Sequence, residues 1–412
     1  MSSSSLITHH SSLAYLDSLQ GSGIRPGLTR IRAMLRALRH PDRAYESIIV
    51  AGTNGKGSTS SMIASILREA GRHAGLYTSP HLVDIRERWL IGGKPIEETL
   101  FEDSIETLRR AADHSGIMPT YFEALTVMAF IAFEQARCEV AVLEVGMGGR
   151  LDATNVVRLI AALITPIGFD HTEFLGNTLR KIAREKAGVI HRGAIVLTSN
   201  RDRVVLSVIE RRAKQFGIDV IVVRGDEADE VPLNGDFQRD NVSLAVRAAR
   251  ELRARLPRIT DDSIATGVAH TQWRGRLERV RMSGKDVWVD GAHNLHAARA
   301  IEPFVDRTLP RQRLLVFGIM TDKDVAGVTS LLFPLFDEII ATDPYPPRSE
   351  PPDHLVAIAK RLGIQATAIA DVGDACRRAL ASDKRSILIA GSLYLAGAAI
   401  AYLDERKRRD QR

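Results

Sequence analysis

The chain has 412 residues, of which 45% are hydrophobic and 26% are charged. This length exceeds one ordinary core, so we expect a soluble globular protein of two domains or three. The 56 basic and 50 acidic side chains leave a net charge of +6, and no nucleic-acid-reading motif accompanies this mild excess. We therefore expect small-molecule partners and no nucleic acid.

The cysteines, the first residues and one long apolar segment bear on location. Cys138 and Cys376 are far apart and lack metal-type spacing, which argues against a disulfide scaffold and agrees with a reducing cytosol. Residues 1–12 lack the pattern of a signal peptide and predict a frayed tail. Residues 386–403 are uncharged, but a Gly-Ser pair divides them into a buried strand, a turn and a packed helix. We expect a cytoplasmic protein without a membrane span.

Short apolar runs alternate with helical patterns along nearly the whole chain, which predicts an α/β protein with mostly parallel sheets. The first unit is a strand over 47–51, a glycine loop, and a helix over 58–71 that stops at Gly71. Further strands are predicted at 139–145, 159–166 and 194–200, with an edge strand at 217–223.

The pattern restarts near residue 273, where four more strand-like runs follow with helices between them. These runs lie within 286–294, 313–324, 337–347 and 386–392. We predict two domains: residues 1–274 form a P-loop-type ATPase domain, and residues 275–412 form a smaller Rossmann-like α/β domain.

The first strand leads into VAGTNGKGS, residues 50–58, which differs from the common nucleotide-binding loop G-x-x-x-x-G-K-[ST]. Val50 occupies the first glycine position, and Gly57 separates Lys56 from Ser58. Backbone N–H groups of such a loop can cradle phosphate oxygens, and Lys56 would neutralise the β- and γ-phosphates. Ser58 or Thr59 could place a hydroxyl near Mg²⁺. A strand–loop–helix without a ligand is the simpler alternative.

An acidic residue at a strand end is the natural partner of such a loop, because it can hold the Mg²⁺, and Glu144 fits that role. The following segment, GMGGRLDATN, resembles a dinucleotide fingerprint. Leu151 occupies its third glycine position, so we reject NAD binding there.

Two further segments carry candidate residues of the first domain. Asp170 and His171 lie just past a predicted strand, where ligands gather in open α/β sheets. His171 could bind a metal or be structural. Lys186 shares a helix with other basic residues, and a solvated basic face is the simpler account of it.

The second domain carries DGAHN at a strand end, so Asp290, His293 and Asn294 are expected to face the cleft. Arg276 precedes them near the domain junction. An arginine at that position could reach phosphates bound to the first domain only when the two domains close.

Taken together, these motifs resemble the folylpolyglutamate synthase and dihydrofolate synthase family of the Mur ligase superfamily. The matching stretches occur in family order from about residue 14 to residue 395. They are GTNGKGS, YTSPHL with IRER, TYFE, EVGMGGRLDATN, DHTEFLG, IAREKAG, FQRDN, RGRLE, DGAHN, DKD and GSLYL. GTNGKGS is similar to the loop of this family, so its extra glycine is a variant and not a break.

The resemblance implies the metal and nucleotide ligands. Mg²⁺ would be held by Ser79, Glu144 and His171, and Lys186 would be carbamylated to an anion that supports the metal and phosphate site. The implied cofactors are ATP, Mg²⁺ with two ions expected, and the carbamylated lysine, while a monovalent cation is left open. ATP would contact Thr53, Asn54, Gly55, Lys56, Gly57 and Ser58, with Asn241 near the base, Arg276 on the phosphates and Asp290 on the ribose side.

The implied catalytic residues are Lys56, Lys186, Arg276 and His293, the last of them beside the transferring phosphoryl group. The acceptor substrate would contact three segments through aromatic stacking and a carboxylate. These segments are Arg25-Pro26-Gly27-Leu28, Thr120-Tyr121-Phe122 and Leu151-Asp152-Ala153. Arg25 and Pro26 depart from the aspartate and leucine of the bifunctional bacterial pattern.

The resemblance implies ATP-dependent ligation of L-glutamate to dihydropteroate, to reduced folates, or to both, through an acyl phosphate. The expected protein is a monomer. Folylpolyglutamate synthesis alone is one alternative, and a Mur-type ligase acting on another carboxylate is a second. Only about 46 residues precede the first strand, too few for the sugar-nucleotide domain of such ligases. A GTPase-like switch is disfavoured, because TDKD at 321–324 has its lysine one place late for guanine recognition.

Overall fold

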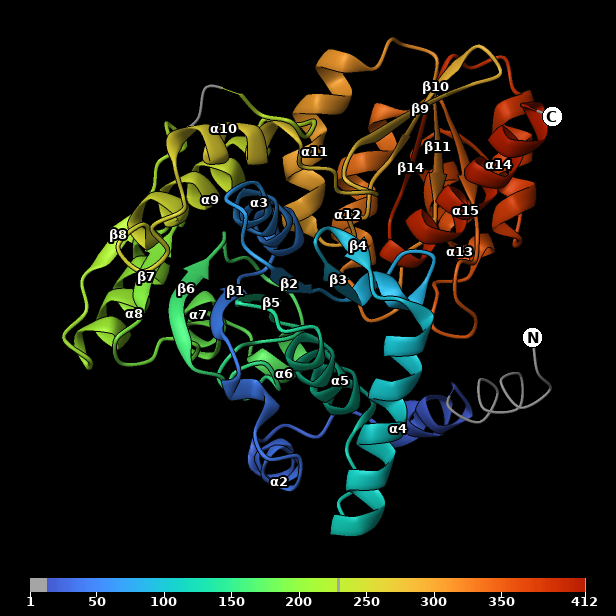
Figure 1. Cartoon of the computed structure of the whole chain (residues 1–412). Helices are drawn as coiled ribbons and strands as arrows, with labels where there is room; N and C mark the ends of the chain where they lie inside the picture. Colours follow the sequence, from blue (N-terminus) through green and yellow to red (C-terminus); the bar gives the residue numbers. More distant parts are fainter. Residues whose placement is uncertain (1–12, 228–229, 412) are drawn as a thin grey trace.

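A computed structural model describes residues 13–227 and 230–411, so the predicted tail at 1–12 lies outside the described residues. Two sheets divide the described chain (Figure 1). The larger has eight strands in the order β4-β3-β2-β5-β1-β6-β7-β8, and the smaller has six in the order β13-β12-β11-β14-β10-β9. Neighbouring strands are parallel except for the pairs β2–β3, β3–β4 and β9–β10. The predicted α/β class with mostly parallel sheets is confirmed.

The central strands of the larger sheet are short apolar runs whose residues are almost all buried, as expected for a sheet covered on both faces. The predicted strands are present, and β8 lies at the edge as predicted. Five strands were not predicted. Three of them, β2, β3 and β4, are two to four residues long and too short to show a period. The other two, β9 and β13, are the partly exposed edge strands of the smaller sheet and lack an apolar run. The strands are β1 (Glu46–Ala51), β2 (Ala74–Tyr77), β3 (Trp89–Ile91), β4 (Lys94–Pro95), β5 (Val140–Glu144), β6 (Leu159–Ile164), β7 (Ile195–Thr198) and β8 (Val220–Val222).

Alternate residues of these strands bury against two helical layers. Ile49, Leu143 and Ile164 belong to a core shared with α2, α4, α5, α7 and α8. Ile48, Val142 and Leu163 belong to a second core shared with α3, α9 and α10 on the other face. The helices are α2 (Thr29–Ala37), α3 (Lys56–Glu69), α4 (Glu98–Ser115), α5 (Tyr121–Gln135), α6 (Thr172–Leu175), α7 (Leu179–Ala187), α8 (Arg203–Lys214), α9 (Gln238–Leu252) and α10 (Asp261–Ala269).

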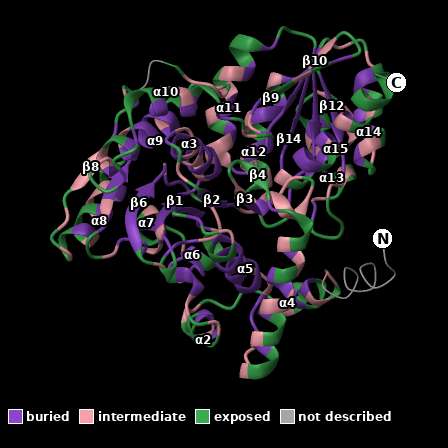
Figure 2. Cartoon of the chain, in the orientation of Figure 1, coloured by how far each residue is buried: buried purple, intermediate pink, exposed green. Residues whose placement is uncertain are grey.

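The smaller sheet has the same three-layer construction, with α11, α12 and α13 in one core and α14 and α15 in the other. Figure 2 shows buried strands inside both sheets and exposed outer faces on the surrounding helices. The strands are β9 (Glu278–Met282), β10 (Lys285–Val289), β11 (Arg313–Phe317), β12 (Glu338–Ala341), β13 (Gln365–Ala368) and β14 (Ser386–Ala390). The helices are α11 (Leu295–Thr308), α12 (Val325–Leu332), α13 (Pro352–Arg361), α14 (Val372–Ala381) and α15 (Leu393–Asp410).

The apolar segment at 386–403 forms β14, a turn and the first turns of α15, as predicted. Among the described residues, no helix has the length and hydropathy needed to cross a membrane. The larger sheet ends at Val222 and the smaller begins at Glu278, so the boundary at 274/275 precedes the first strand of the second sheet. That boundary stays a prediction.

Candidate active site

A cavity of about 300 Å³ lies between the two sheets. Its walls are built from segments that follow the carboxyl ends of parallel strands, where open α/β sheets bind ligands. From the larger sheet come the loop after β1, Glu144 at the end of β5, and the segment after β6. From the smaller sheet come the segments that follow β10, β11, β12 and β14.

The glycine loop joins β1 to α3 and lines this cavity with Thr53, Asn54, Gly55, Lys56, Gly57 and Ser58. The hydroxyl of Thr53 donates to the Gly168 carbonyl at 3.1 Å and accepts from the Gly168 N–H at 3.0 Å, which ties the loop to the segment after β6. Gly55 has φ of +86°, and a side chain there would meet the Asn241 amide oxygen at 2.2 Å. The loop therefore needs glycine at residue 55 for both conformation and space.

Gly57, the residue that breaks the common loop pattern, lies in the first turn of α3. A Cβ at this position would lie 2.9 Å from Nε1 of Trp273, closer than ordinary contacts allow. The extra glycine therefore permits close packing between the loop and the chain near the domain junction. The hydroxyl groups of Ser58, Thr59 and Ser60 are buried without a hydrogen-bond partner. Buried polar groups of this kind call for a partner. Of the three residues only Ser58 lines the cavity, where an anionic or metal-bound ligand would supply one.

Ser79, Glu144 and His171, the predicted metal ligands, all line the cavity. Glu144 is 5% exposed, and its one hydrogen bond is from the Ser79 N–H at 3.3 Å. Burial raises the pKa of this carboxyl group, while Lys56, the Ser79 N–H and Arg276 oppose the rise. Burial lowers the pKa of His171 to about 4, so its ring is neutral at pH 7 and able to bind a metal.

The described residues contain no cluster of three or more His, Cys, Asp or Glu side chains that could hold a metal ion. The predicted ligand set is instead one carboxylate, one imidazole and one hydroxyl, from Glu144, His171 and Ser79. A hard cation such as Mg²⁺ takes few protein ligands and completes its shell with water and phosphate oxygens. The underpartnered Glu144 fits such an ion, and the metal role of these residues stays a prediction.

Lys186 lies in α7 and is only 4% exposed, whereas Arg180, Lys181 and Arg184 of the same helix are exposed. The simpler account, a solvated basic face, is therefore wrong for Lys186. Its Nζ donates to the carbonyl of Gly52, at the start of the glycine loop, at 2.6 Å. Burial, assisted by the charge of Lys56, lowers the pKa of Lys186 to about 7.

Arg276, Asp290 and His293 also line the cavity, and Asn241 faces it from α9. Asn294, which was expected to face the cleft, does not line the cavity and instead contacts Asp170 and Asn54. Asp290 accepts from the Leu277 N–H at 2.8 Å and the Ala292 N–H at 2.7 Å, so it organises its own loop. The His293 Nδ1–H donates to the Gly291 carbonyl at 2.8 Å, which leaves Nε2 facing Asp170. The structure thus brings Arg276, Asp290 and His293 to the same cavity as the glycine loop.

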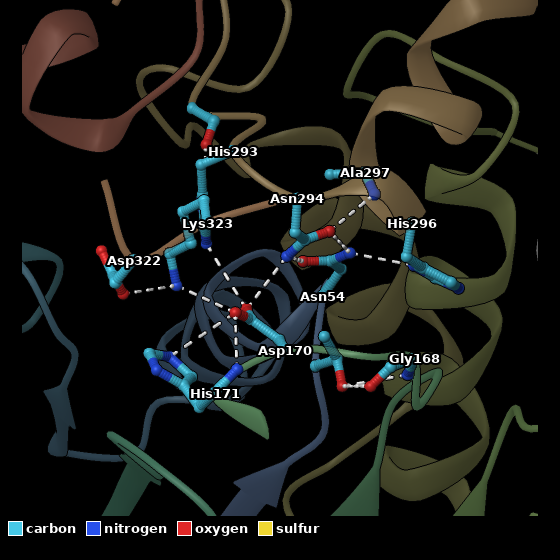
Figure 3. A network of polar contacts seen from close by, with 12 residues as sticks. Asn54, Gly168, Asp170, His171, His293, Asn294, His296, Ala297, Asp322 and Lys323 are labelled. Carbon is cyan, nitrogen blue, oxygen red and sulfur yellow. Dashed lines mark hydrogen bonds and ion pairs between the residues drawn. The ribbon is translucent and has the colours of Figure 1, made fainter. Parts of the chain in front are cut away.

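A polar network joins the two sheets at this cavity (Figure 3). Asp170, from the larger sheet, accepts from Nζ of Lys323 at 2.9 Å and from the side-chain amide of Asn294 at 3.0 Å. The Asn54 amide donates to Oδ1 of Asn294 at 3.0 Å and to Nδ1 of His296 at 2.9 Å. Burial disfavours ionisation of Asp170, but His293 and the neighbouring cations outweigh burial and hold its pKa below the usual range.

Several residues of this cavity were assigned no role from the sequence, although the quoted stretches DKD and GSLYL contain two of them. Lys323, Arg348 and Ser392 follow β11, β12 and β14, and His296 lies near the start of α11. Their signal was available in principle, because each of the first three lies after a predicted strand of the smaller sheet. Nothing in their residue types separates them from ordinary loop residues, however, until the partner wall of the cavity is known.

The three predicted acceptor segments do not line the cavity itself. Thr120 caps α5 and Asp152 holds a loop, accepting from the N–H groups of Gly146, Met147 and Thr154 and from the Thr154 hydroxyl. The Tyr121 N–H donates to the hydroxyl of Ser22 at 3.0 Å, which places the segment near 25–28 beside α5. The acceptor roles of all ten residues stay predictions.

The Asp170–Lys323 pair gives a direct test of the contact between the sheets. Both side chains are more than 90% buried, so Asp170→Asn leaves the Lys323 charge poorly compensated and should cost about 3–5 kcal/mol of stability, with wider separation of the two parts. Urea unfolding and small-angle X-ray scattering would measure both effects.

Asp322→Asn is the matched control, because Asp322 contacts the same lysine at 3.5 Å but is 41% exposed. Adding Lys323→Met to Asp170→Asn should recover part of the loss, since no buried charge then remains unpaired. Equal stability of the Asp170→Asn and Asp322→Asn proteins would contradict the assigned role of the pair.

Comparisons with known proteins agree on the family. The Mur ligase middle domain matches residues 50–247, and the Mur ligase glutamate ligase domain matches residues 275–393. The chain is 36% identical to a probable bifunctional folylpolyglutamate synthase/dihydropteroate synthase of Halobacterium salinarum over 93% of its length, and it spans about half, 50%, of that relative. It is 34% identical to the dihydrofolate synthase/folylpolyglutamate synthase of Mycobacterium tuberculosis, covering 91% of this chain and 90% of that protein.

Solved structures give the same answer. The chain resembles E. coli FolC in complex with DHPP and ADP, with a TM-score of 0.86 and 30% identity over 97% of this chain and 98% of that one. It also resembles the bifunctional folylpolyglutamate synthase/dihydrofolate synthase of Yersinia pestis complexed with AMPPNP and Mn, with a TM-score of 0.83 and 30% identity over 96% and 98% of the two chains. The chain therefore belongs to the folylpolyglutamate synthase/dihydrofolate synthase family of Mur ligases.

Proposed function

We propose that this protein is an ATP-dependent amide ligase that joins L-glutamate to dihydropteroate, to reduced folate (poly)glutamates, or to both. One observation carries the proposal: the glycine loop, Glu144 and His171 of one sheet face Arg276 and His293 of the other across a single cavity. The ligands named for the E. coli and Y. pestis structures, DHPP with ADP and AMPPNP with Mn, support the same substrates here.

The reaction has two displacements. An oxygen of the acceptor carboxylate attacks the γ-phosphorus of ATP, the bridging P–O bond breaks, and ADP leaves. The glutamate amine then attacks the carbonyl carbon of the acyl phosphate, phosphate leaves, and the nitrogen loses a proton to solvent. Phosphoryl transfer depends mainly on positioning and charge stabilisation, which Lys56 and Arg276 supply from opposite walls of the cavity.

Ser79, Glu144 and His171 would hold Mg²⁺, which supplies positive charge to the phosphate oxygens when it is bound. The carboxylate of Glu144 is buried and accepts one backbone hydrogen bond among the described residues, so it has room for a metal ion as a further partner. His293 is held by the Gly291 carbonyl with Nε2 toward the larger sheet, so it can contact the transferring group. The ion pairs of Asp170 with His293 and Lys323 hold these two residues of the predicted second domain close to the glycine loop.

Carbamylation of Lys186 is part of the proposal. A carbamate forms when a neutral amine adds to CO₂ and releases a proton, and an ordinary lysine is almost fully protonated at neutral pH. With a pKa near 7, a large fraction of Lys186 is neutral at pH 7–8. The product is an anion at the start of the glycine loop. It would balance the charge of Lys56, which assists burial in lowering the pKa of the amine.

The remaining expectations stay predictions. They are the division into residues 1–274 and 275–412, the monomeric state, the cytoplasmic location, a second Mg²⁺ ion and the requirement for a monovalent cation. The division is supported by the start of β9 at Glu278 and by the proximity of Arg276 to both parts of the cavity wall.

The deciding experiment is phosphate release from ATP, Mg²⁺ and L-glutamate, with dihydropteroate and a reduced folate compared as acceptors. Turnover with both establishes the two activities. Turnover with the folate alone means that Arg25 and Pro26 mark a lost dihydropteroate site. If neither acceptor supports turnover, the proposed function is wrong and a Mur-type ligase acting on another carboxylate replaces it.

Lys56→Ala and Arg276→Ala should each lower turnover by on the order of 10²–10³, because each removes a positive group from the transferring phosphate. Melting temperatures close to that of the parent protein would show that the fold is intact. Near-normal turnover in either folded variant would remove that residue from the mechanism.

Lys186→Ala should be inactive and partly rescued by a small added carboxylic acid that replaces the carbamate. In the parent protein, removal of CO₂ at pH 8 should lower activity, and added bicarbonate should restore it. Full activity of Lys186→Ala, or indifference of the parent protein to CO₂, would argue against the carbamate.

A further inference from the structure

Arg88 ends the short helical turn η3 (Ile85–Arg88) and leads directly into β3. It is only 7% exposed, an unusual degree of burial for a side chain that is always charged. Its Nε donates to Nδ1 of His81 at 3.0 Å. The nitrogen that accepts this bond belongs to a neutral imidazole, so the bond does not balance the arginine charge.

No carboxylate of the described residues lies within ion-pair distance of Arg88, although its own segment contains two acids. Asp84 pairs with Arg86 at 2.8 Å. Glu87 accepts the backbone N–H groups of Leu82, Val83 and Asp84 at 2.8–3.3 Å. Both acids are therefore committed to holding the turn, and the charge of Arg88 is left for another partner.

Arg313 shows how the same chain satisfies a structural buried arginine. It is 2% exposed and donates to the carbonyls of Leu309 at 2.7 Å and Asp306 at 3.0 Å, with further bonds to Pro310 and Leu335. Asp306 also places a carboxylate oxygen 3.8 Å away. Arg88 by contrast uses one of its five N–H donors. Its two terminal nitrogens have no hydrogen-bond partner among the described residues, and neither is fully buried, so both can be reached by solvent.

The charge of Arg88 acts on groups in two directions. Toward the cavity, burial raises the pKa of Glu144, and Arg88 is one of the cations that oppose the rise. Toward the predicted acceptor segment, burial raises the pKa of Tyr121, and Arg88 again opposes it.

Hydrogen bonds of the segment that contains Arg88 give its position. The Arg88 carbonyl accepts from the Thr78 N–H at 3.0 Å, next to Ser79 of the cavity wall, and Nε1 of Trp89 donates to the Leu125 carbonyl of α5, the helix that begins at Tyr121. Arg88 does not line the cavity itself, and its segment joins the cavity wall to the helix of the predicted acceptor segment.

We propose that Arg88 binds a carboxylate of the acceptor substrate through its two terminal nitrogens. The inference rests on the proposed function and names a residue that distinguishes the acceptor from the other substrates. The planar guanidinium group matches a carboxylate with two parallel hydrogen bonds, and burial strengthens them. Because His81 holds Nε, the free edge of the group has a fixed direction before the substrate arrives.

Arg88→Gln should raise the KM of the acceptor, dihydropteroate or tetrahydrofolate, by about 10- to 100-fold, as the loss of a charge-assisted bond pair predicts. The KM values of ATP and L-glutamate should change by less than about twofold. Arg86→Gln is the matched control from the same turn, because Arg86 already has its own carboxylate in Asp84. It should leave all three KM values close to those of the parent protein.

Direct binding of the same acceptor, measured by calorimetry with a non-hydrolysable ATP analogue present, gives a readout that does not depend on turnover. Arg88→Lys keeps the positive charge but loses the two parallel donors of the guanidinium group. Its acceptor affinity should therefore lie between those of the parent protein and Arg88→Gln. This variant also serves if Arg88→Gln does not fold. Intermediate affinity of the lysine variant supports the proposal.

Two results would overturn it: parent-like acceptor affinity in both folded variants, or a rise confined to the KM of L-glutamate. The first would leave Arg88 a structural residue, and the second would assign its carboxylate to the incoming amino acid. If the parent protein itself neither binds nor uses a pterin acceptor, the proposed function fails together with the inference. A parent protein that is active while Arg88→Gln is unchanged discards the inference alone.

Discussion

Asp170 is a buried carboxylate of the larger sheet whose side-chain partners come mainly from the smaller one: Lys323, Asn294 and His293. A buried carboxylate is stable only when cations and hydrogen-bond donors compensate the loss of water. The two halves must therefore meet in one geometry for Asp170 to be satisfied. That geometry also closes the cavity, because the same segments carry the glycine loop on one side and His293 on the other.

Burial has opposite consequences for the other charged groups around the cavity, and these consequences suit their proposed roles. It raises the pKa of Glu144, which a metal ion would reverse, and it lowers the pKa of Lys186 toward neutrality, which favours reaction with CO₂. Arg88 is buried and has no carboxylate partner among the described residues. In each case the protein holds a charged group that is incompletely compensated until a ligand or a modification arrives. Sites of this kind are more often functional than structural.

Local sequence could predict most of the strands, because a buried strand between turn residues is legible from its own apolar run. The short strands β2, β3 and β4 were missed, since two to four residues carry no period. The edge strands β9 and β13 were missed because their side chains are partly exposed and form no apolar run. Strand-end position and motif resemblance together supplied the predicted nucleotide, metal and catalytic residues, all of which line the cavity, including Ser79, which no local rule would select. Lys323 and Arg348 were assigned no role from the sequence, although DKD is one of the quoted stretches, because their roles arise from the wall opposite them and not from their neighbours in the chain.

The sequence by itself determined the α/β class, the loop that enters α3, and the placement of candidate residues after strand ends, because these depend on residue types and short periods. Only the tertiary structure decided which charges are buried and which are paired. Asp170 meets Lys323 across 153 positions, Gly57 is needed because Trp273 packs against it, and Lys186 alone is buried among the basic residues of α7. Such facts lie between segments that are distant in the chain, and no local pattern contains them.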